Sequence, residues 1–202
     1  MASGKIGILI GTFDPIHNGH LLLGESAREQ FSLDRVIFIP ANLAHLQDST
    51  DISSGEDRFE MVKLAIKDNP YFKCSRIEID KPNGTYTYDT VQEIKNMYPG
   101  EEVYLILGAD DIFDITNWYK VKELFDSCSV LVAARREDDL VALDKKRREL
   151  STQYNADIQI LTFNRIDLSA TDIRKRISIG RSIRYMVPED CIGYICLKGL
   201  YK

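Results

Sequence analysis

Apolar and β-branched residues gather in short runs along the chain, and these runs predict the strands of a sheet. Each run ends at a glycine, a proline or a polar stretch, as buried strands do. The first two runs, residues 5–10 and 36–40, flank a segment of helical character, so they form a strand–helix–strand unit with parallel strands. The further expected strands are residues 102–107, 129–134 and 158–163, and partial alternation over residues 72–79 predicts an edge strand.

Between the strands, apolar positions recur at the spacing of helices. Residues 56–67 have acidic residues in the first turn and a lysine in the last, which the helix dipole favours. Asp89 or Thr87 is expected to cap a helix over residues 90–97. The other expected helices are residues 21–31 and 140–150, with a last short helix or turn within residues 188–201. This alternation predicts an α/β fold in one domain, residues 1–202, with a mostly parallel sheet of five to six strands and a small C-terminal helical part.

Composition and charge narrow the class of protein. The chain has 202 residues, of which 44% are hydrophobic, enough for a packed core. Its net charge of −5 gives no basic footprint for nucleic acid, although small anions need only a local positive site. With no basic leader and no apolar run long enough to span a bilayer, we expect a cytoplasmic protein with no membrane partner. The sequence leaves open whether the chain forms a homo-oligomer.

The four cysteines give no sign of a metal site. Cys74, Cys128, Cys191 and Cys196 form no C-x-x-C pair, and no histidine lies near them at metal-ligand spacing. Cys128 and Cys196 lie in apolar runs, so we expect both to be buried thiols. We expect no metal bound by protein side chains.

The stretch from residue 11 to residue 20 reads G-T-F-D-P-I-H-N-G-H and joins the first strand to the first helix. A strand, a glycine-bearing loop and a helix aim free backbone N–H groups and the helix dipole at an anion. His17 and His20 lie at this helix entrance, where each can donate to a phosphate oxygen and gain charge when a polyphosphate raises its pKa. One such histidine is usually structural, but a pair three residues apart, with Gly11 before it and Gly19 within it, predicts a polyphosphate site.

A second stretch with the same chemistry begins at residue 167 and reads D-L-S-A-T-D-I-R. Ser169 or Thr171 opens a helix as its N-cap, which places hydroxyl groups beside free backbone N–H groups. Arg174 and Arg176 follow within two turns and add positive charge. Plain helix capping is the alternative interpretation of the two hydroxyl residues.

Other candidate residues follow the ends of strands, where ligands of open parallel sheets bind. Gly108 and Asp110 follow the strand at residues 102–107, so Asp110 is placed to hold a ribose hydroxyl or to cap a helix. Arg136 follows the strand at residues 129–134. A pair of arginines at that position suits phosphate, although surface arginines are common.

Three more candidates lie in loops. Trp118 is the only tryptophan, and it is either a packing residue or a platform for a flat heteroaromatic ring. Tyr86 and Thr87 precede a helix, so their backbone amides could receive a carboxylate, or the threonine could simply be a cap. His45 lies in the polar loop of residues 42–55, where it is either solvated or functional.

These motifs resemble those of the nucleotidyltransferase superfamily that carries an H-x-G-H motif. L-S-A-T-D-I-R is similar to its second motif, of the I-S-x-T-x-x-R type. Within the superfamily the likeness runs nearly end to end with the bacterial nicotinate-nucleotide adenylyltransferase family, through Tyr86-Thr87, Gly108-Ala-Asp110, Trp118-Tyr119 and the closing Gly199-Leu-Tyr201. The resemblance implies a Rossmann-like, doubly wound α/β fold and the reaction of ATP with nicotinate mononucleotide, giving deamido-NAD and pyrophosphate.

The resemblance also implies roles for the candidate residues, with Mg2+ arriving bound to ATP. His17, His20 and Arg174 would be catalytic, because they would hold the phosphates and stabilise developing charge. The implied ATP-binding residues are Gly11, Thr12, Phe13, His17, Gly19, His20, Gly108, Asp110, Ser169, Thr171 and Arg174. The implied mononucleotide-binding residues are His45, Tyr86, Thr87, Trp118 and Arg136.

The chain departs from the family pattern at Ile10, at residues 43–46 and at residues 136–138, on or near the side of the acceptor. Two alternatives therefore stay open. One is the same chemistry on nicotinamide mononucleotide or phosphopantetheine, and the other is a nucleotide-binding module that does not catalyse. The small-molecule substrates expected as partners are ATP and a pyridine mononucleotide.

Overall fold

The computed structural model describes residues 3–42, 52–134, 137–162 and 166–202, and the side chains of residues 137–139 are not described. Six strands form one sheet in the order β3-β2-β1-β4-β5-β6, which is the strand order of a Rossmann fold. The strands are β1 (Lys5–Gly11), β2 (Arg35–Pro40), β3 (Phe72–Cys74), β4 (Glu102–Gly108), β5 (Ser129–Ala133) and β6 (Ile158–Leu161).

The sheet confirms the predicted parallel arrangement. β1 pairs with β4, β4 with β5 and β5 with β6, all in parallel, with Lys5 opposite Glu102 and Val130 opposite Ile158. The middle residues of these strands are buried on both faces, which explains their continuous apolar runs. The edge strand is shorter than expected. β3 ends at Cys74, and residues 77–80 form a turn instead of continuing the strand.

The described helices are α1 (Asn18–Phe31), α2 (Gly55–Ile66), α3 (Thr87–Met97), α4 (Ala109–Asp114), α5 (Val121–Phe125), α6 (Glu137–Tyr154), α7 (Ala170–Ser178) and α8 (Glu189–Lys198), with a 3-10 turn η2 (Ile115–Asn117). They confirm the doubly wound α/β class and the C-terminal helical part. The expected caps of α3 were wrong. The helix begins at Thr87, its N-cap is Tyr86, and no side chain forms a cap hydrogen bond there.

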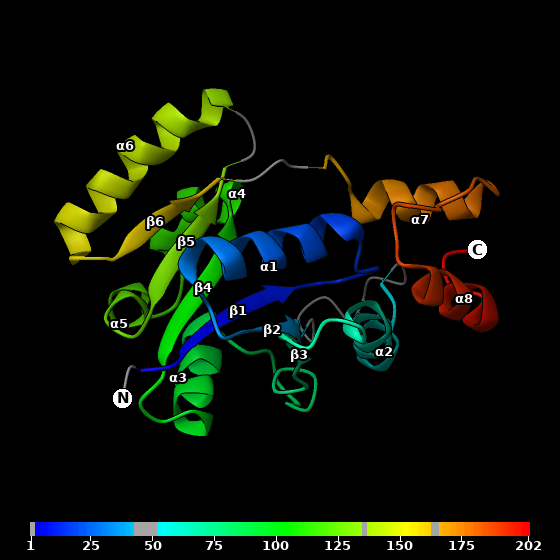
Figure 1. Ribbon diagram of the computed structural model, residues 1–202, viewed down its shortest axis with the longest axis horizontal. Helices are drawn as coiled ribbons and strands as arrows, with labels where there is room; N and C mark the ends of the chain where they lie inside the picture. The colour runs from blue at the N-terminus through cyan, green and yellow to red at the C-terminus, as the bar shows by residue number, and fades with distance from the viewer. Residues whose placement is uncertain (1–2, 43–51, 135–136, 163–165) are drawn as a thin grey trace. The chain divides into compact units, whose positions relative to one another are not determined.

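The chain divides into two compact units. The first unit is residues 1–9, 23–37 and 85–164, and the second unit is residues 10–22, 38–84 and 165–202. In the first unit, β4, β5 and β6 pack with α3, α5 and α6, and Figure 1 shows α6 beside β6. The prediction of a single domain over residues 1–202 stays a prediction.

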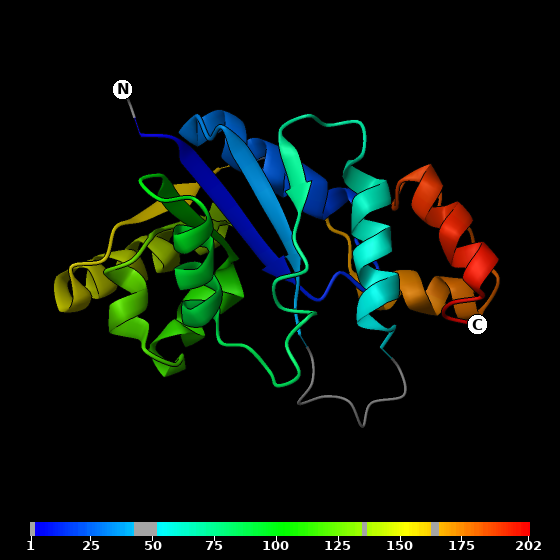
Figure 2. The same ribbon diagram turned by 90° about the horizontal axis from the view of Figure 1, so that it is seen from below.

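In the second unit, α8 packs along α2, and both views show the two helices side by side (Figures 1 and 2). The Cys191 thiol on α8 donates to the Met61 carbonyl oxygen on α2 at 3.1 Å, and the Tyr194 hydroxyl donates to Asp57 at 2.9 Å. Cys128 is buried as expected, but Cys196 is exposed because it lies on the outer face of α8. No helix among the described residues has both the length and the apolar character needed to cross a membrane.

Candidate functional site: two phosphate motifs in the second unit

The two histidines of the first motif lie together at the start of α1. Their imidazole rings stack with centroids 3.6 Å apart and planes inclined by 16°. The backbone N–H of His17 donates to Nδ1 of His20 at 3.2 Å, and the Phe13 ring meets the His20 ring edge-on with centroids 5.1 Å apart. α1 begins at Asn18, earlier than expected, so Gly19 and His20 belong to its first turn.

Gly19 is the residue that permits this stacking. A Cβ atom at this position would lie 3.1 Å from Nδ1 and 3.2 Å from Cε1 of His17, closer than side chains normally approach. The glycine between the two histidines therefore has a steric purpose in the free protein, before any ligand is considered.

The contacts of His20 determine where its proton lies. Because Nδ1 accepts the His17 N–H, the neutral ring carries its hydrogen on Nε2 and can donate from that atom. Burial, and to a lesser degree the neighbouring His17, lower the pKa of His20 well below the usual 6.5. His20 is therefore neutral in the free protein at pH 7, and a nearby polyphosphate favours its protonation.

Asp14 of the first motif and Arg174 of the second motif are in direct contact. Nη1 of Arg174 donates to the Asp14 carbonyl oxygen at 2.7 Å, and the same nitrogen lies 3.8 Å from the Asp14 carboxylate. Nη2 of Arg174 lies 3.4 Å from the Thr171 hydroxyl oxygen one turn earlier on α7. The structure thus brings the two motifs together within the second unit.

The first backbone N–H groups of α7 have no acceptor within the helix, as at the start of any α-helix. Ser169 occupies the N-cap position, as one of the two expected alternatives, but its side chain makes no cap hydrogen bond. The first backbone bond of the helix runs from Ile173 N–H to the Ser169 carbonyl oxygen. The amides of residues 170–172 therefore precede the helical hydrogen bonds, in the arrangement that binds anions.

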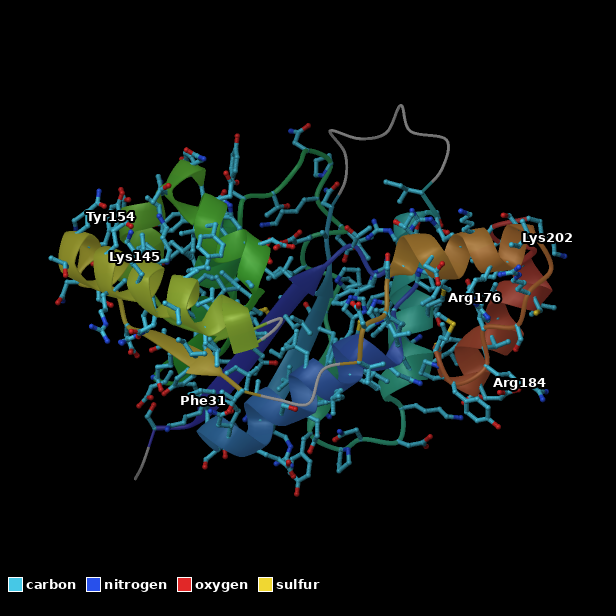
Figure 3. The ribbon with its side chains drawn as sticks, turned by 90° about the horizontal axis from the view of Figure 1, so that it is seen from above. Phe31, Lys145, Tyr154, Arg176, Arg184 and Lys202 are labelled. Atoms are coloured by element: carbon cyan, nitrogen blue, oxygen red, sulfur yellow. The ribbon has the colours of Figure 1, made fainter. Side chains whose placement is uncertain are left out.

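A cavity of about 520 Å³ opens beside this helix. Thr171 and Arg174 line it, as do Lys175 and Lys202, which add two cationic groups to the lining. The hydroxyl groups of Ser53, Ser178 and Tyr201 also line the wall. Figure 3 labels Lys202 at the end of the chain, beside α7. The cavity therefore presents mainly positive and hydroxyl groups, which suit a phosphate ligand.

One further residue, Arg58, supports the first motif, and the sequence interpretation assigned it no role. Arg58 on α2 is 3% exposed, and its Nη1 donates to the Thr12 carbonyl oxygen at 2.8 Å. Its Nε donates to the Ser53 carbonyl oxygen at 3.2 Å. Burial lowers the pKa of Arg58, and the carboxylate of Asp14 opposes that shift. A charged residue inside the apolar pattern of residues 56–67 was the available signal for such a buried contact.

The candidate acceptor residues Tyr86, Thr87 and Trp118 lie in the first unit. The Tyr86 and Tyr119 rings are 4.4 Å apart between centroids, and the Lys120 ammonium lies 5.1 Å from the Tyr119 ring. Trp118 is half-buried and ends the turn η2. Thr87 opens α3, whose first backbone bond runs from Thr90 to Tyr86, so the amides of residues 87–89 precede the helical bonds.

Gly108 and Asp110 also lie in the first unit, at the end of β4. The Gly108 N–H donates to the Asp111 carboxylate at 3.1 Å, so Asp111, and not Asp110, makes the side-chain bond that closes the start of α4. Asp110 is exposed in the first turn of that helix. The N-cap of α4 is Gly108, so Asp110 does not occupy that position. His45 and Arg136 lie outside the described residues.

Known proteins match this chain over almost its whole length. The cytidylyltransferase-like family model matches residues 8–176. A relative from Caldicellulosiruptor bescii, named probable nicotinate-nucleotide adenylyltransferase, is 41% identical over 98% of this chain and 99% of its own length. A relative of the same name from Roseiflexus sp. is 39% identical over the full length of both chains.

Solved structures share the fold at lower identity. Plasmodium falciparum nicotinic acid mononucleotide adenylyltransferase complexed with APC matches with a TM-score of 0.76 and 18% identity, over 98% of this chain and 97% of that chain. The same enzyme complexed with NaAD matches with a TM-score of 0.76 and 19% identity over the same shares.

The parallel sheet and the two phosphate motifs define a nucleotidyltransferase, and the chain belongs to the cytidylyltransferase-like family. Its full-length likeness places it, within that family, among the nicotinate-nucleotide adenylyltransferases. Nucleotidyltransferases of this kind generally use ATP together with a divalent metal ion.

Proposed function

We propose that this protein transfers the adenylyl group of ATP to nicotinate mononucleotide, giving deamido-NAD and pyrophosphate in the biosynthesis of NAD. The observation that carries the proposal is the bond between the two phosphate motifs, from Arg174 to the Asp14 carbonyl oxygen. This bond connects the loop that carries the histidine pair to the helix that carries Arg174. Full-length relatives are named probable nicotinate-nucleotide adenylyltransferase, which also supports the proposal.

In the proposed reaction, the phosphate of the mononucleotide attacks the α-phosphorus of ATP in line. A new P–O bond forms on the α-phosphorus, the bond to the oxygen bridging the α- and β-phosphates breaks, and that oxygen leaves with the pyrophosphate. The substrate itself supplies the nucleophile, so the protein contributes position and charge stabilisation.

We assign the catalytic roles to the second unit. His20 donates from Nε2 to a phosphate oxygen, and His17 accompanies it at the helix entrance. Arg174 stabilises the charge that develops on the departing pyrophosphate, with its guanidinium already held by Asp14. The backbone of Gly11, Thr12, Phe13 and Gly19 and the amides and hydroxyls of Ser169 and Thr171 would hold the phosphates of ATP.

The positive cavity beside α7 suits the β- and γ-phosphates, because Thr171 and Arg174 both line it. We propose Mg2+ as the divalent ion that enters with ATP. An ion held by phosphate oxygens and water needs few protein ligands. It would neutralise phosphate charge while the side chains named above fix the geometry.

The acceptor contacts are assigned to residues of the first unit. Trp118 would stack on the pyridine ring, and the amides of Tyr86 and Thr87 would receive its carboxylate, as the free start of α3 permits. Gly108 and Asp110 would contact the ribose of ATP. His45 and Arg136 are proposed to approach the mononucleotide on the basis of the family pattern alone.

The test is an acceptor panel in which pyrophosphate release from ATP is followed with nicotinate mononucleotide, nicotinamide mononucleotide and phosphopantetheine. We expect a strong preference for the nicotinate form, because helix-start amides hydrogen-bond a carboxylate better than an amide. Equal rates with both pyridine nucleotides, or activity with phosphopantetheine alone, would contradict the assigned acceptor. ATP binding without pyrophosphate release from any acceptor would indicate a non-catalytic nucleotide-binding protein.

A further inference from the structure

We propose that Tyr201 is a positioning residue for adenylyl transfer, which acts on Arg174 through the buried carboxylate of Asp14. The inference rests on the proposed function, because it concerns the leaving pyrophosphate that Arg174 is assigned to stabilise. Tyr201 follows the last helix and was part of no phosphate motif in the sequence.

The backbone after α8 turns so that Tyr201 reaches the first motif. Gly199 ends the helix with a φ of 64°, and Leu200 N–H donates to the Ile195 carbonyl oxygen. Tyr201 itself has a φ of 64°, in the left-handed region that residues with a side chain rarely adopt. Its hydroxyl donates to Oδ1 of Asp14 at 2.5 Å. The residue with this strained backbone is thus the one whose side chain contacts Asp14 of the first motif.

Asp14 depends on a small set of donors. Its side chain is 1% exposed, and both carboxylate oxygens lie 3.3 Å from the Ser53 N–H. The Tyr201 hydroxyl adds a donor to Oδ1, and the Arg174 guanidinium lies at 3.8 Å. A buried carboxylate that loses a donor draws more strongly on the donors that remain.

Asp14 and pyrophosphate therefore compete for the same guanidinium. With the Tyr201 hydroxyl in place, Asp14 is sufficiently satisfied to leave Arg174 bonded to the carbonyl oxygen and facing the cavity. Without the hydroxyl, Arg174 is expected to move toward the carboxylate and away from the phosphates. Burial and the hydrogen bond to Asp14 raise the pKa of Tyr201, so its hydroxyl remains a donor at neutral pH.

Tyr201→Phe removes only the hydroxyl, and Tyr194→Phe is its matched control. Tyr194 also belongs to the C-terminal segment of the second unit and donates to a carboxylate at 2.9 Å. That carboxylate belongs to Asp57, which lies in the first turn of α2, outside both phosphate motifs. Both variants lose one tyrosine–carboxylate bond. A purely structural role of Tyr201 predicts similar changes in the two proteins.

The decisive measurement is the inhibition constant of pyrophosphate as a product inhibitor, because it does not depend on the fraction of folded enzyme. For Tyr201→Phe we expect that constant to rise and kcat to fall, each by about tenfold, as a small displacement of a positioned group can cost. Tyr194→Phe is expected to keep the wild-type inhibition constant. Equal inhibition constants in Tyr201→Phe, Tyr194→Phe and wild type would overturn the inference.

A double variant tests whether Tyr201 acts through Arg174. In an Arg174→Lys background, Tyr201→Phe is expected to add little further change, whereas full additivity of the two effects would overturn the inference. If Tyr201→Phe does not fold, Asp14→Asn replaces it. That variant keeps one side-chain oxygen that can accept from Ser53 and Tyr201, but it no longer holds a charge near Arg174. An unchanged inhibition constant would again overturn the inference.

Direct binding separates this inference from the proposed function. Calorimetric titration of magnesium pyrophosphate into wild type, Tyr201→Phe and Tyr194→Phe requires no acceptor and no turnover. Wild-type protein that turns over no acceptor refutes the proposed function, yet weaker binding in Tyr201→Phe alone still supports the positioning of Arg174. Equal binding by all three proteins counts against the positioning role even when wild type is an active enzyme.

Discussion

The two units of this chain carry candidate residues in very different surroundings. In the second unit, Asp14 and His17 are 1% and 6% exposed, and hydrogen bonds join the histidine loop to Arg58 and Arg174. In the first unit, Tyr86 is 57% exposed, and the other two described acceptor candidates, Thr87 and Trp118, are half-buried. One region is fixed by its own contacts, and the other presents aromatic surface.

This difference matches two kinds of task. Charge stabilisation in a transition state requires donors whose positions are set before the reaction, which the folded second unit provides. Binding of a flat ring requires aromatic faces that are still accessible, which the first unit provides. We therefore expect substitutions in the second unit to lower kcat, and substitutions at the aromatic residues of the first unit to raise the KM of the acceptor.

The largest effect is expected for His20→Ala. Loss of a preorganised donor to the phosphates should lower kcat by about 100- to 1,000-fold, equivalent to roughly 3–4 kcal/mol of transition-state stabilisation. Steady-state pyrophosphate release measures this change, and circular dichroism checks that the fold remains. Near-normal turnover would remove His20 from the catalytic role and break the contrast between the two units.

A smaller effect, on a different constant, is expected for Trp118→Ala. Loss of an aromatic platform should raise the KM for nicotinate mononucleotide by about tenfold, in line with roughly 1–3 kcal/mol for stacking of a base on an aromatic ring. The KM for ATP should stay within about twofold. Trp118→Phe is the matched control, because it keeps a ring and should recover most of the affinity. A change in the KM for ATP alone would reverse the assignment of Trp118.

The sequence was sufficient for the features that depend on local pattern. Continuous apolar runs located the five longer strands, and the motif at residues 11–20 located the histidine pair. Each of these features consists of consecutive residues, so a local pattern is enough to find it. The predicted end of β3 at residue 79 was wrong, because the strand ends at Cys74. The alternation over residues 75–79 is also compatible with a turn, and strand pairing at a sheet edge depends on tertiary contacts.

Features built from distant residues were not accessible in the same way. The bond from Tyr201 to Asp14 joins residues 187 positions apart, and the bond from Arg58 to Thr12 joins residues 46 positions apart. No spacing rule connects such residues. Similarly, the exposure of Cys196 depends on which face of α8 packs on α2, which an apolar run around the cysteine does not reveal.

The smallest effect expected is on stability, and it comes from the proton of His20. Burial and His17 lower the pKa of His20 in the folded protein below the 6.5 of an unperturbed histidine, so between those two values the unfolded chain binds more protons than the folded one. The stabilisation associated with neutral His20 is therefore complete above pH 6.5 and is lost as the pH falls through the folded pKa.

His20→Asn isolates this contribution, because the shorter amide keeps an oxygen acceptor for the His17 N–H but does not titrate. Urea unfolding at pH 7.5 and at pH 5.5 gives the loss of stability on acidification for each protein. We expect that loss to be smaller in His20→Asn than in wild type. An equal loss in both proteins would mean that the fold does not lower the pKa of His20. Burial in the second unit would then not hold the proposed donor in its neutral form, and the contrast between the two units would lose this support.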